Sequence, residues 1–179
     1  QVQFSQMERI VFISGSGNDT VNGNSGADLL TGNGGADAIY GYGGDDTLNG
    51  GEGNDTLDGD GGSDTASHAD DPAGVSVNLA SQTAIDGWGD ADVLIGIENA
   101  SGSAHADTLT GSTGDNVLAG RAGNDVLAGG NGTDTADYSG DPAGVTVNLA
   151  INTATDGWGH TDSLSSIENV TGSAHGDAI

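Results

Sequence analysis

The sequence predicts an all-β solenoid in which short strands stack in coils around ladders of aliphatic side chains. Three observations predict it: a strict nine-residue repeat, a glycine-rich first half that forms a tight turn, and one aliphatic residue at a fixed place in each second half. A single repeat of this kind cannot bury its apolar side chain, so neighbouring repeats have to stack. No stretch of convincing length has a helical period.

The first block holds six repeats in one phase, starting at Ser14. Glycine occupies every fourth position, and an aliphatic residue occupies every eighth position from Val21 to Ala66. A disordered glycine-rich linker has no reason to keep this phase, so the periodicity argues against the disorder that composition alone would allow. Aspartate occupies every sixth position, namely Asp19, Asp28, Asp37, Asp46, Asp55 and Asp64.

A second block of four repeats starts at Gly102. Its sixth positions are Asp107, Asn116, Asp125 and Asp134. A third block starts at Gly172 and stops inside a repeat, which we interpret as the cut end of a longer protein.

A longer period relates the segments between the blocks, because residues 62–109 match residues 132–179 at an offset of 70. The alternation of Val75, Val77 and Leu79 in the first connector predicts strands of a half-buried sheet that continue or cap the stack. We therefore expect a lead-in connector strand at 1–13, repeats at 14–67, connector strands at 68–101, repeats at 102–137, connector strands at 138–171 and the start of a third block at 172–179.

The formal net charge of the chain is −25, with two arginines and no lysine. A compact state of this charge repels itself unless cations neutralise it. Nucleic acid and anionic membranes are therefore disfavoured as partners, and divalent cations are favoured. The absence of cysteine excludes disulfides and thiolate sites, and no run of about 18 apolar residues predicts a membrane span.

The sixth-position aspartates are the predicted functional residues. Calcium takes roughly 6–8 oxygen ligands from carboxylates and carbonyls, and a glycine-rich turn exposes carbonyls beside the aspartate. Turns stacked along one edge would bring two aspartates to one ion, whereas without the ion these carboxylates repel each other. Calcium is therefore the predicted cofactor.

The repeats resemble those of the repeat-in-toxin (RTX) family, whose pattern is G-G-x-G-x-D-x-U-x. GNGGADAIY from Gly32 and GYGGDDTLN from Gly41 carry the resemblance, which covers nearly the whole chain after Ser14. It implies a parallel β-roll with two repeats per coil and one calcium ion between repeats i and i+2. The earlier turn gives its second and fourth carbonyls and its aspartate, and the later turn gives its first and third carbonyls and its aspartate.

Carried onto this chain, the resemblance implies roughly six or more ions. In the first block the four ligand sets are Gly15, Gly17, Asp19, Gly32, Gly34 and Asp37; Asn24, Gly26, Asp28, Gly41, Gly43 and Asp46; Asn33, Gly35, Asp37, Gly50, Glu52 and Asp55; and Tyr42, Gly44, Asp46, Gly59, Gly61 and Asp64. In the second block the two sets are Ser103, His105, Asp107, Gly120, Ala122 and Asp125; and Ser112, Gly114, Asn116, Gly129, Asn131 and Asp134.

The second block departs from the family pattern, because Asn116 carries no charge and His105 replaces a turn glycine. We expect weaker binding or an altered turn at both sites. The four histidines have no helical metal-ligand spacing, so a structural or surface role is favoured. For Trp88 and Trp158, packing against the roll is favoured over stacking on sugar rings.

No catalytic motif is visible, so we expect no enzyme within these residues. The resemblance implies a calcium-binding module of a larger bacterial exoprotein, which folds on calcium outside the cell and supports type I secretion and stability. Two alternatives remain: a polysaccharide-binding module of a secreted carbohydrate-active enzyme, and a structural spacer of an RTX adhesin.

Overall fold

The computed structural model describes residues 9–179, and within that range its regular elements are strands without any helix. The strands are β1 (Val11–Ile13), β2 (Thr20–Asn24), β3 (Leu29–Gly34), β4 (Ala38–Tyr42), β5 (Thr47–Glu52), β6 (Thr56–Asp58), β7 (Thr65–Ser67), β8 (Ser76–Asn78), β9 (Thr83–Ile85), β10 (Ala91–Ile95), β11 (Asn99–Ser101), β12 (Thr108–Thr110), β13 (Val117–Ala119), β14 (Val126–Ala128), β15 (Thr135–Asp137), β16 (Thr146–Asn148), β17 (Thr153–Thr155), β18 (Thr161–Ser165) and β19 (Asn169–Thr171).

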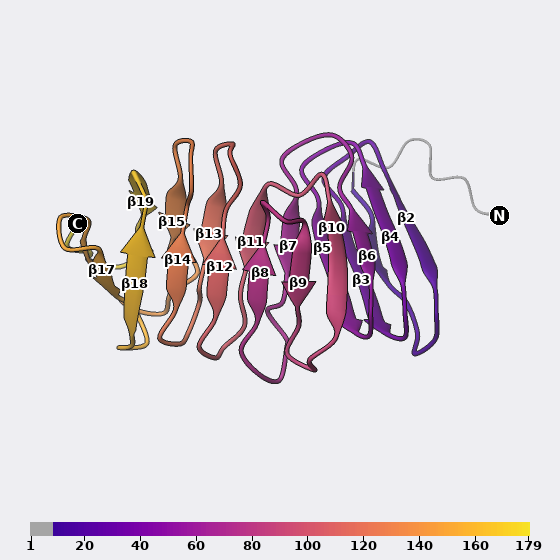
Figure 1. The fold of residues 1–179 in the computed structure, drawn as a ribbon, viewed down its shortest axis with the longest axis horizontal. Coiled ribbons are helices and arrows are strands. Elements are labelled where there is room, and N and C mark those ends of the chain that lie inside the picture. Colours follow the sequence, from indigo (N-terminus) through magenta and orange to yellow (C-terminus); the bar gives the residue numbers. More distant parts are fainter. Residues whose placement is uncertain (1–8) are drawn as a thin grey trace.

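The strands form two sheets along the long axis of the molecule, with the described chain running from one end of the stack to the other (Figure 1). The parallel sheet has the order β1-β3-β5-β7-β11-β13-β15-β19, and the mixed sheet has the order β16-β17-β18-β14-β12-β8-β9-β10-β6-β4-β2. Within a block, paired residues lie 18 positions apart, as in Leu30 with Leu48 and Val21 with Ile39. Two nonapeptides therefore complete one coil, and the prediction of an all-β parallel roll is confirmed.

Each connector adds three strands to the mixed sheet, where an ordinary coil adds one. In the first connector, β8, β9 and β10 form an antiparallel meander, of which β10 pairs with β6 and β8 pairs with β12. In the parallel sheet, β11 pairs directly with both β7 and β13. At about 4.8 Å per strand, the mixed sheet is roughly 10 Å longer at each connector. The two layers therefore have to fan or twist relative to each other there.

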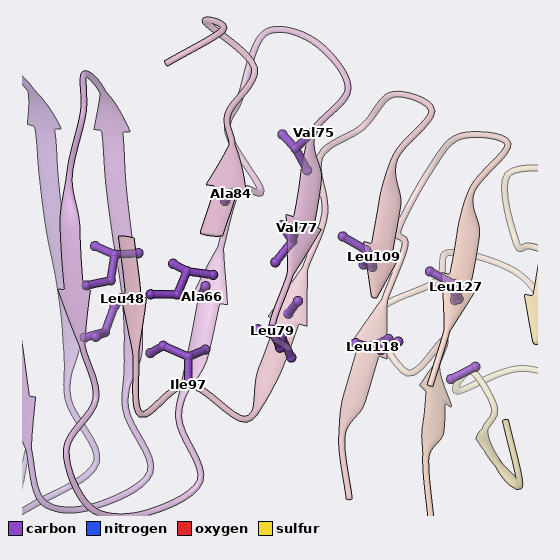
Figure 2. Close-up of a cluster of buried hydrophobic side chains, with 14 of the residues drawn as sticks. Leu48, Ala66, Val75, Val77, Leu79, Ala84, Ile97, Leu109, Leu118 and Leu127 are labelled. Atoms are coloured by element: carbon purple, nitrogen blue, oxygen red, sulfur yellow. The ribbon is translucent and has the colours of Figure 1, made fainter. Parts of the chain in front are cut away.

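The eighth-position side chains fill the space between the sheets. Leu30, Ile39, Leu48 and Leu57 are fully buried in successive repeats of the first block. Burying one such side chain stabilises the fold by about 1.5–3 kcal/mol, and one per nine residues makes a thin core. Figure 2 shows how the connectors join this core with side chains of their own, among them Val75, Val77, Leu79, Ala84 and Ile97 beside Leu48, Ala66, Leu109, Leu118 and Leu127.

The turn of a repeat can carry left-handed residues at the second and fourth positions of that repeat. The φ angles are 68° at Asn33 and 73° at Tyr42 in second positions, and 117° at Gly35 and 111° at Gly44 in fourth positions. Only glycine adopts the fourth-position values readily, which explains the glycine of the pattern. The left-handed Asn33 and Tyr42 each cost roughly 1–2 kcal/mol, so the turns are held in place by other interactions.

Residues 1–8 of the predicted lead-in connector lie outside the described residues, and β1 begins after them at Val11. No membrane-crossing helix occurs within residues 9–179.

The aliphatic ladder predicts a sharp contrast between neighbouring positions of β14. Leu127 is fully buried, whereas 44% of the surface of Val126 is exposed. In the calcium-saturated chain, Leu127→Ala should lower the free energy of unfolding by about 2–5 kcal/mol. Val126→Ala should change it by less than about 1 kcal/mol. Urea unfolding followed by circular dichroism measures both, and equal losses would contradict a core that depends on one side chain per repeat.

Candidate metal centres

One oxygen of the sixth-position carboxylates after Asp19 ties neighbouring coils together. The backbone N–H of Asp28 donates to Asp46 Oδ1 at 2.8 Å, and that of Asp37 donates to Asp55 Oδ1 at the same distance. In the second block, the N–H of Asp107 donates to Oδ1 of Asp125. A buried amide without a partner costs about 1–3 kcal/mol, so the aspartates hold the stack together as well as supplying charge.

The other oxygen of these carboxylates has no hydrogen-bond partner in six repeats. The side chains are almost fully buried, with at most 3% of their surface exposed. A buried carboxylate oxygen without a partner is unfavourable, and a cation relieves that cost. The six are Oδ2 of Asp37, Asp46, Asp55, Asp64, Asp125 and Asp134.

The same six repeats have a left-handed second residue. These residues are Asn33, Tyr42, Gly51, Asp60, Arg121 and Gly130. In the first turns of each block the second residue is not left-handed, and its N–H donates to its own aspartate: Asn24 to Asp28 Oδ2, and Ser103 to Asp107 Oδ2, both at 2.7 Å. The left-handed conformation thus accompanies loss of this contact and leaves the carboxylate oxygen free.

The second carboxylate oxygen faces a carbonyl of the next coil across the first-position glycine. A Cβ atom on Gly32 would lie 2.3 Å from Asp37 Oδ2 and 2.6 Å from the Gly50 carbonyl oxygen. A Cβ atom on Gly23 would lie 2.6 Å from both Asp28 Oδ2 and the Gly41 carbonyl oxygen. Glycine is required here because two oxygens of one predicted ligand set converge on the space that a side chain would fill.

Further carbonyls of the predicted sets lie in the stacked turns of the first block. The N–H of Gly43 donates to the Asn24 carbonyl at 3.0 Å, and that of Gly61 donates to the Tyr42 carbonyl at 2.7 Å. A carbonyl oxygen has two lone pairs, so each of these acceptors keeps one that can face an ion. The ligand sets themselves stay predictions.

The two unusual residues of the second block have structural explanations. His105 occupies a fourth position but is not left-handed, so its side chain causes no backbone strain. Asn116 Oδ1 accepts from the Ser112 N–H at 2.6 Å, and Asn116 Nδ2 donates to the Glu98 carbonyl at 2.6 Å. Because hydrogen bonds within the protein already occupy its amide group, Asn116 is a poor ligand beside the aspartates.

Two carboxylates per connector also join the ladder, and the sequence analysis did not assign them. Each accepts a hydrogen bond from the backbone N–H of a sixth-position aspartate at 2.9–3.0 Å. The pairs are Asp55 with Asp92, Asp125 with Asp162, Asp64 with Glu98, and Asp134 with Glu168. A remnant of the repeat was a usable signal, since Asp92 and Asp162 each lie two residues before a buried leucine.

Within residues 9–179, no three histidine, aspartate or glutamate side chains converge on one point. The predicted sites need only two carboxylates each, and backbone carbonyls supply the rest. Such an oxygen donor set suits calcium and not zinc. His68 is buried with Nδ1 3.3 Å from Asp71 Oδ2, and Tyr138 takes the corresponding position in the second connector.

Burial raises the pKa of several of these carboxyl groups in the metal-free fold. The pKa of Asp92 and of Asp125 is raised to about 7, and those of Asp55, Asp64 and Asp162 are raised to about 6. Backbone hydrogen bonds counter part of the effect of burial, and neighbouring carboxylates add to it. The stacked turns therefore favour either a proton or a cation on these groups.

These shifts predict that acid stabilises the metal-free fold. Between about pH 4, where unfolded aspartate titrates, and pH 6–7, the folded state binds more protons than the unfolded state. Its stability therefore falls as pH rises through this range. In chelator, β-type circular dichroism should be stronger at pH 5 than at pH 7.5. In saturating calcium the order should reverse, because protons compete with the ion. Loss of β signal on acidifying the metal-free chain would contradict the prediction.

Asp46 belongs to two predicted sites, which makes it a direct test of the ligand sets. Asp46→Asn should raise the calcium concentration at half-maximal folding roughly tenfold or more, because it removes a carboxylate ligand. Asp45→Asn is the matched control: Asp45 is exposed, and its Oδ1, which accepts from the Ser63 N–H at 3.0 Å, is kept in asparagine. Equal shifts in both variants would show that only total charge matters.

Comparison with known proteins agrees with this geometry. The family model described as RTX calcium-binding nonapeptide repeat (4 copies) matches residues 13–48, 31–66 and 101–136, which together cover half of the chain. No curated protein matches the chain significantly. With the two-repeat coil, the glycine turns and the rows of buried aspartates, this match shows that the chain belongs to the RTX calcium-binding nonapeptide-repeat family.

Proposed function

We propose that the chain is a calcium-dependent folding module of a larger secreted protein. The observation that carries the proposal is the row of six buried carboxylate oxygens without hydrogen-bond partners. In the metal-free fold each of them destabilises the native state. A bound cation turns each of them into a stabilising contact, so that binding energy is also folding energy.

The net charge supports the same mechanism. A chain with one core side chain per nonapeptide buries little apolar surface when it collapses. Because its charge is −25, collapse also increases the repulsion between its carboxylates. Six ions of charge +2 would neutralise roughly twelve of these charges. The fold then forms when calcium neutralises the turns, and the aliphatic side chains become buried between the two sheets.

A calcium-gated fold suits export. Extracellular calcium modules bind in the range of about 10⁻⁴–10⁻³ M, above the free calcium concentrations at which cytosolic sensors work. The chain stays unfolded inside the cell, passes a type I secretion channel, and folds outside. The remainder of the parent protein then carries the enzymatic, toxic or adhesive activity.

Calcium titration of the chelator-treated chain, followed by far-UV circular dichroism, tests this function. We expect a cooperative change from coil to β signal that chelator reverses. Magnesium should not replace calcium, because it demands octahedral geometry and dehydrates reluctantly. A chain that is fully folded in chelator at neutral pH, or disordered in millimolar calcium, would sink the mechanism.

A specific observation also favours the polysaccharide-binding alternative. Trp158 and Arg121 line an open hollow of about 440 Å³ on the outer face of the parallel sheet, and Trp88 lines a second of about 420 Å³. Equivalent residues at an offset of 70 line the two hollows, such as Thr31 in one and Ser101 in the other. Each of the two tryptophans has 42% of its surface exposed, so neither is part of the core and neither is fully exposed to solvent.

The tryptophan loops are held in place for such a contact. The N–H of Trp158 donates to Asp156 Oδ1 at 3.0 Å, and the N–H of Gly157 donates to Asp141 Oδ2 at 2.7 Å. Under this alternative, Trp158→Ala and Trp88→Ala in the calcium-loaded chain should abolish binding on an array of neutral and acidic glycans. An unchanged array profile would leave the tryptophans with packing alone.

A further inference from the structure

The connectors contain a shortened turn that reproduces the geometry of a repeat turn with different residues. β11 pairs with β7 so that Asn99 lies opposite Thr65, which places Glu98 opposite Asp64. The residue two positions before it, Gly96, has a φ angle of 57°. A repeat turn has four residues between its first-position glycine and its aspartate, whereas only Ile97 separates Gly96 from Glu98.

Glu98 performs the contact that a sixth-position aspartate performs elsewhere. Glu98 Oε2 accepts from the Asp64 N–H at 2.9 Å, as Asp64 Oδ1 accepts from the Asp46 N–H at 2.8 Å. The glutamate side chain is one methylene longer than aspartate. That extra length lets its carboxylate reach the ladder from a turn that is three residues shorter.

The carbonyl of the shortened turn also takes the place of a repeat carbonyl. A Cβ atom on Gly59 would lie 2.4 Å from the Gly96 carbonyl oxygen and 2.5 Å from Asp64 Oδ2. This is the arrangement found at Gly32, where the two oxygens come from a predicted calcium site. Asp64 is fully buried, and its Oδ2 has no hydrogen-bond partner.

The second connector repeats every part of this arrangement. Glu168 Oε2 accepts from the Asp134 N–H at 2.9 Å, and Asp134 Oδ2 is buried without a partner. A Cβ atom on Gly129 would lie 2.0 Å from the Ser166 carbonyl oxygen and 2.4 Å from Asp134 Oδ2. Ser166 has a φ angle of 49°, so the left-handed turn is kept here without glycine and against its steric cost.

We propose that each connector closes a calcium site of its own, beyond the sites that the repeat pattern defines. The ligands of the first are the carboxylates of Asp64 and Glu98 with the carbonyls of Asp60, Gly62 and Gly96. Those of the second are the carboxylates of Asp134 and Glu168 with the carbonyls of Gly130, Gly132 and Ser166. The inference rests on the proposed calcium-binding function and extends it to residues outside the matched repeats.

The shortened turn has consequences for affinity. It has no third-position residue, so it supplies one carbonyl fewer than a repeat turn and leaves more of the coordination shell to water. Glu98 is half-buried and Glu168 is exposed. The connector sites therefore fill at higher calcium concentrations than the sites inside the first block, and the site at Glu168 fills last.

The number of ions bound per folded chain tests the proposal. Equilibrium dialysis with metal analysis, at calcium concentrations that saturate folding, should give two ions fewer for the double variant Glu98→Gln, Glu168→Gln than for the unmodified chain. The matched control, Asp115→Asn, removes an exposed charge whose Oδ1 accepts from the Thr133 N–H at 2.7 Å, and it should lose none. An unchanged count in the double variant would overturn the inference.

A second measurement tests the proposal even if the double variant fails to fold. Crystals of the unmodified chain grown in calcium should give anomalous density within about 2.3–2.6 Å of the Asp64 and Glu98 carboxylates. Filled repeat sites with no density at Glu98 and Glu168 would overturn this inference and leave the proposed function intact. A chain that binds no calcium anywhere would overturn both.

Discussion

The backbone amide that precedes each strand depends on a carboxylate from the next coil, and the rest of the roll follows from this contact. Asp46 Oδ1 satisfies the N–H of Asp28, which fixes the register of the coils at 18 residues. The same contact takes a charged group out of water and leaves its second oxygen without a partner. A stacked repeat whose second residue is left-handed therefore adds one buried carboxylate oxygen without a partner, and a coil of two such repeats adds two. Stacking itself therefore creates the need for a cation beside the buried carboxylate oxygens, whatever the ion is.

The thin core makes this requirement decisive. An ordinary domain buries enough apolar surface to tolerate a few unfavourable polar groups, but each nonapeptide contributes one aliphatic side chain, and at Ala66 and Ala136 only a methyl group. The left-handed second residues add backbone strain in the same turns that hold the carboxylates. The gain from burying one side chain, about 1.5–3 kcal/mol, is close to the cost of a left-handed turn residue, roughly 1–2 kcal/mol. The balance between folded and unfolded chain therefore depends on neutralisation of the turns.

The periodic part of this arrangement could be predicted from the sequence, and the connectors could be predicted only as strands. A fixed nine-residue phase determines which residues face inward and which lie in turns, so the buried ladder and the aspartate rows follow from counting. Counting in nines does not reach Asp92 and Glu98, because the connector places them 37 and 34 residues after Asp55 and Asp64. Left-handed Tyr42 was also beyond reach, since a tyrosine has no local preference for that conformation and adopts it because the stacked turn imposes it.

The connectors show that the structural rule concerns the position of an oxygen and not the spacing of residues. A long turn with aspartate and a short turn with glutamate bring a carboxylate to the same amide, and Gly96 or Ser166 brings a carbonyl to the same glycine. The mixed sheet can therefore gain two extra strands per connector while the row of carboxylates on one edge continues across the junction. The shape of the roll can therefore change without a change in its charge pattern. An insertion lengthens one layer and leaves the carboxylate–amide contacts in place. An insertion that also displaced the glutamate would leave Asp64 or Asp134 with a backbone amide that lacks a partner, in addition to the buried carboxylate oxygen that already lacks one.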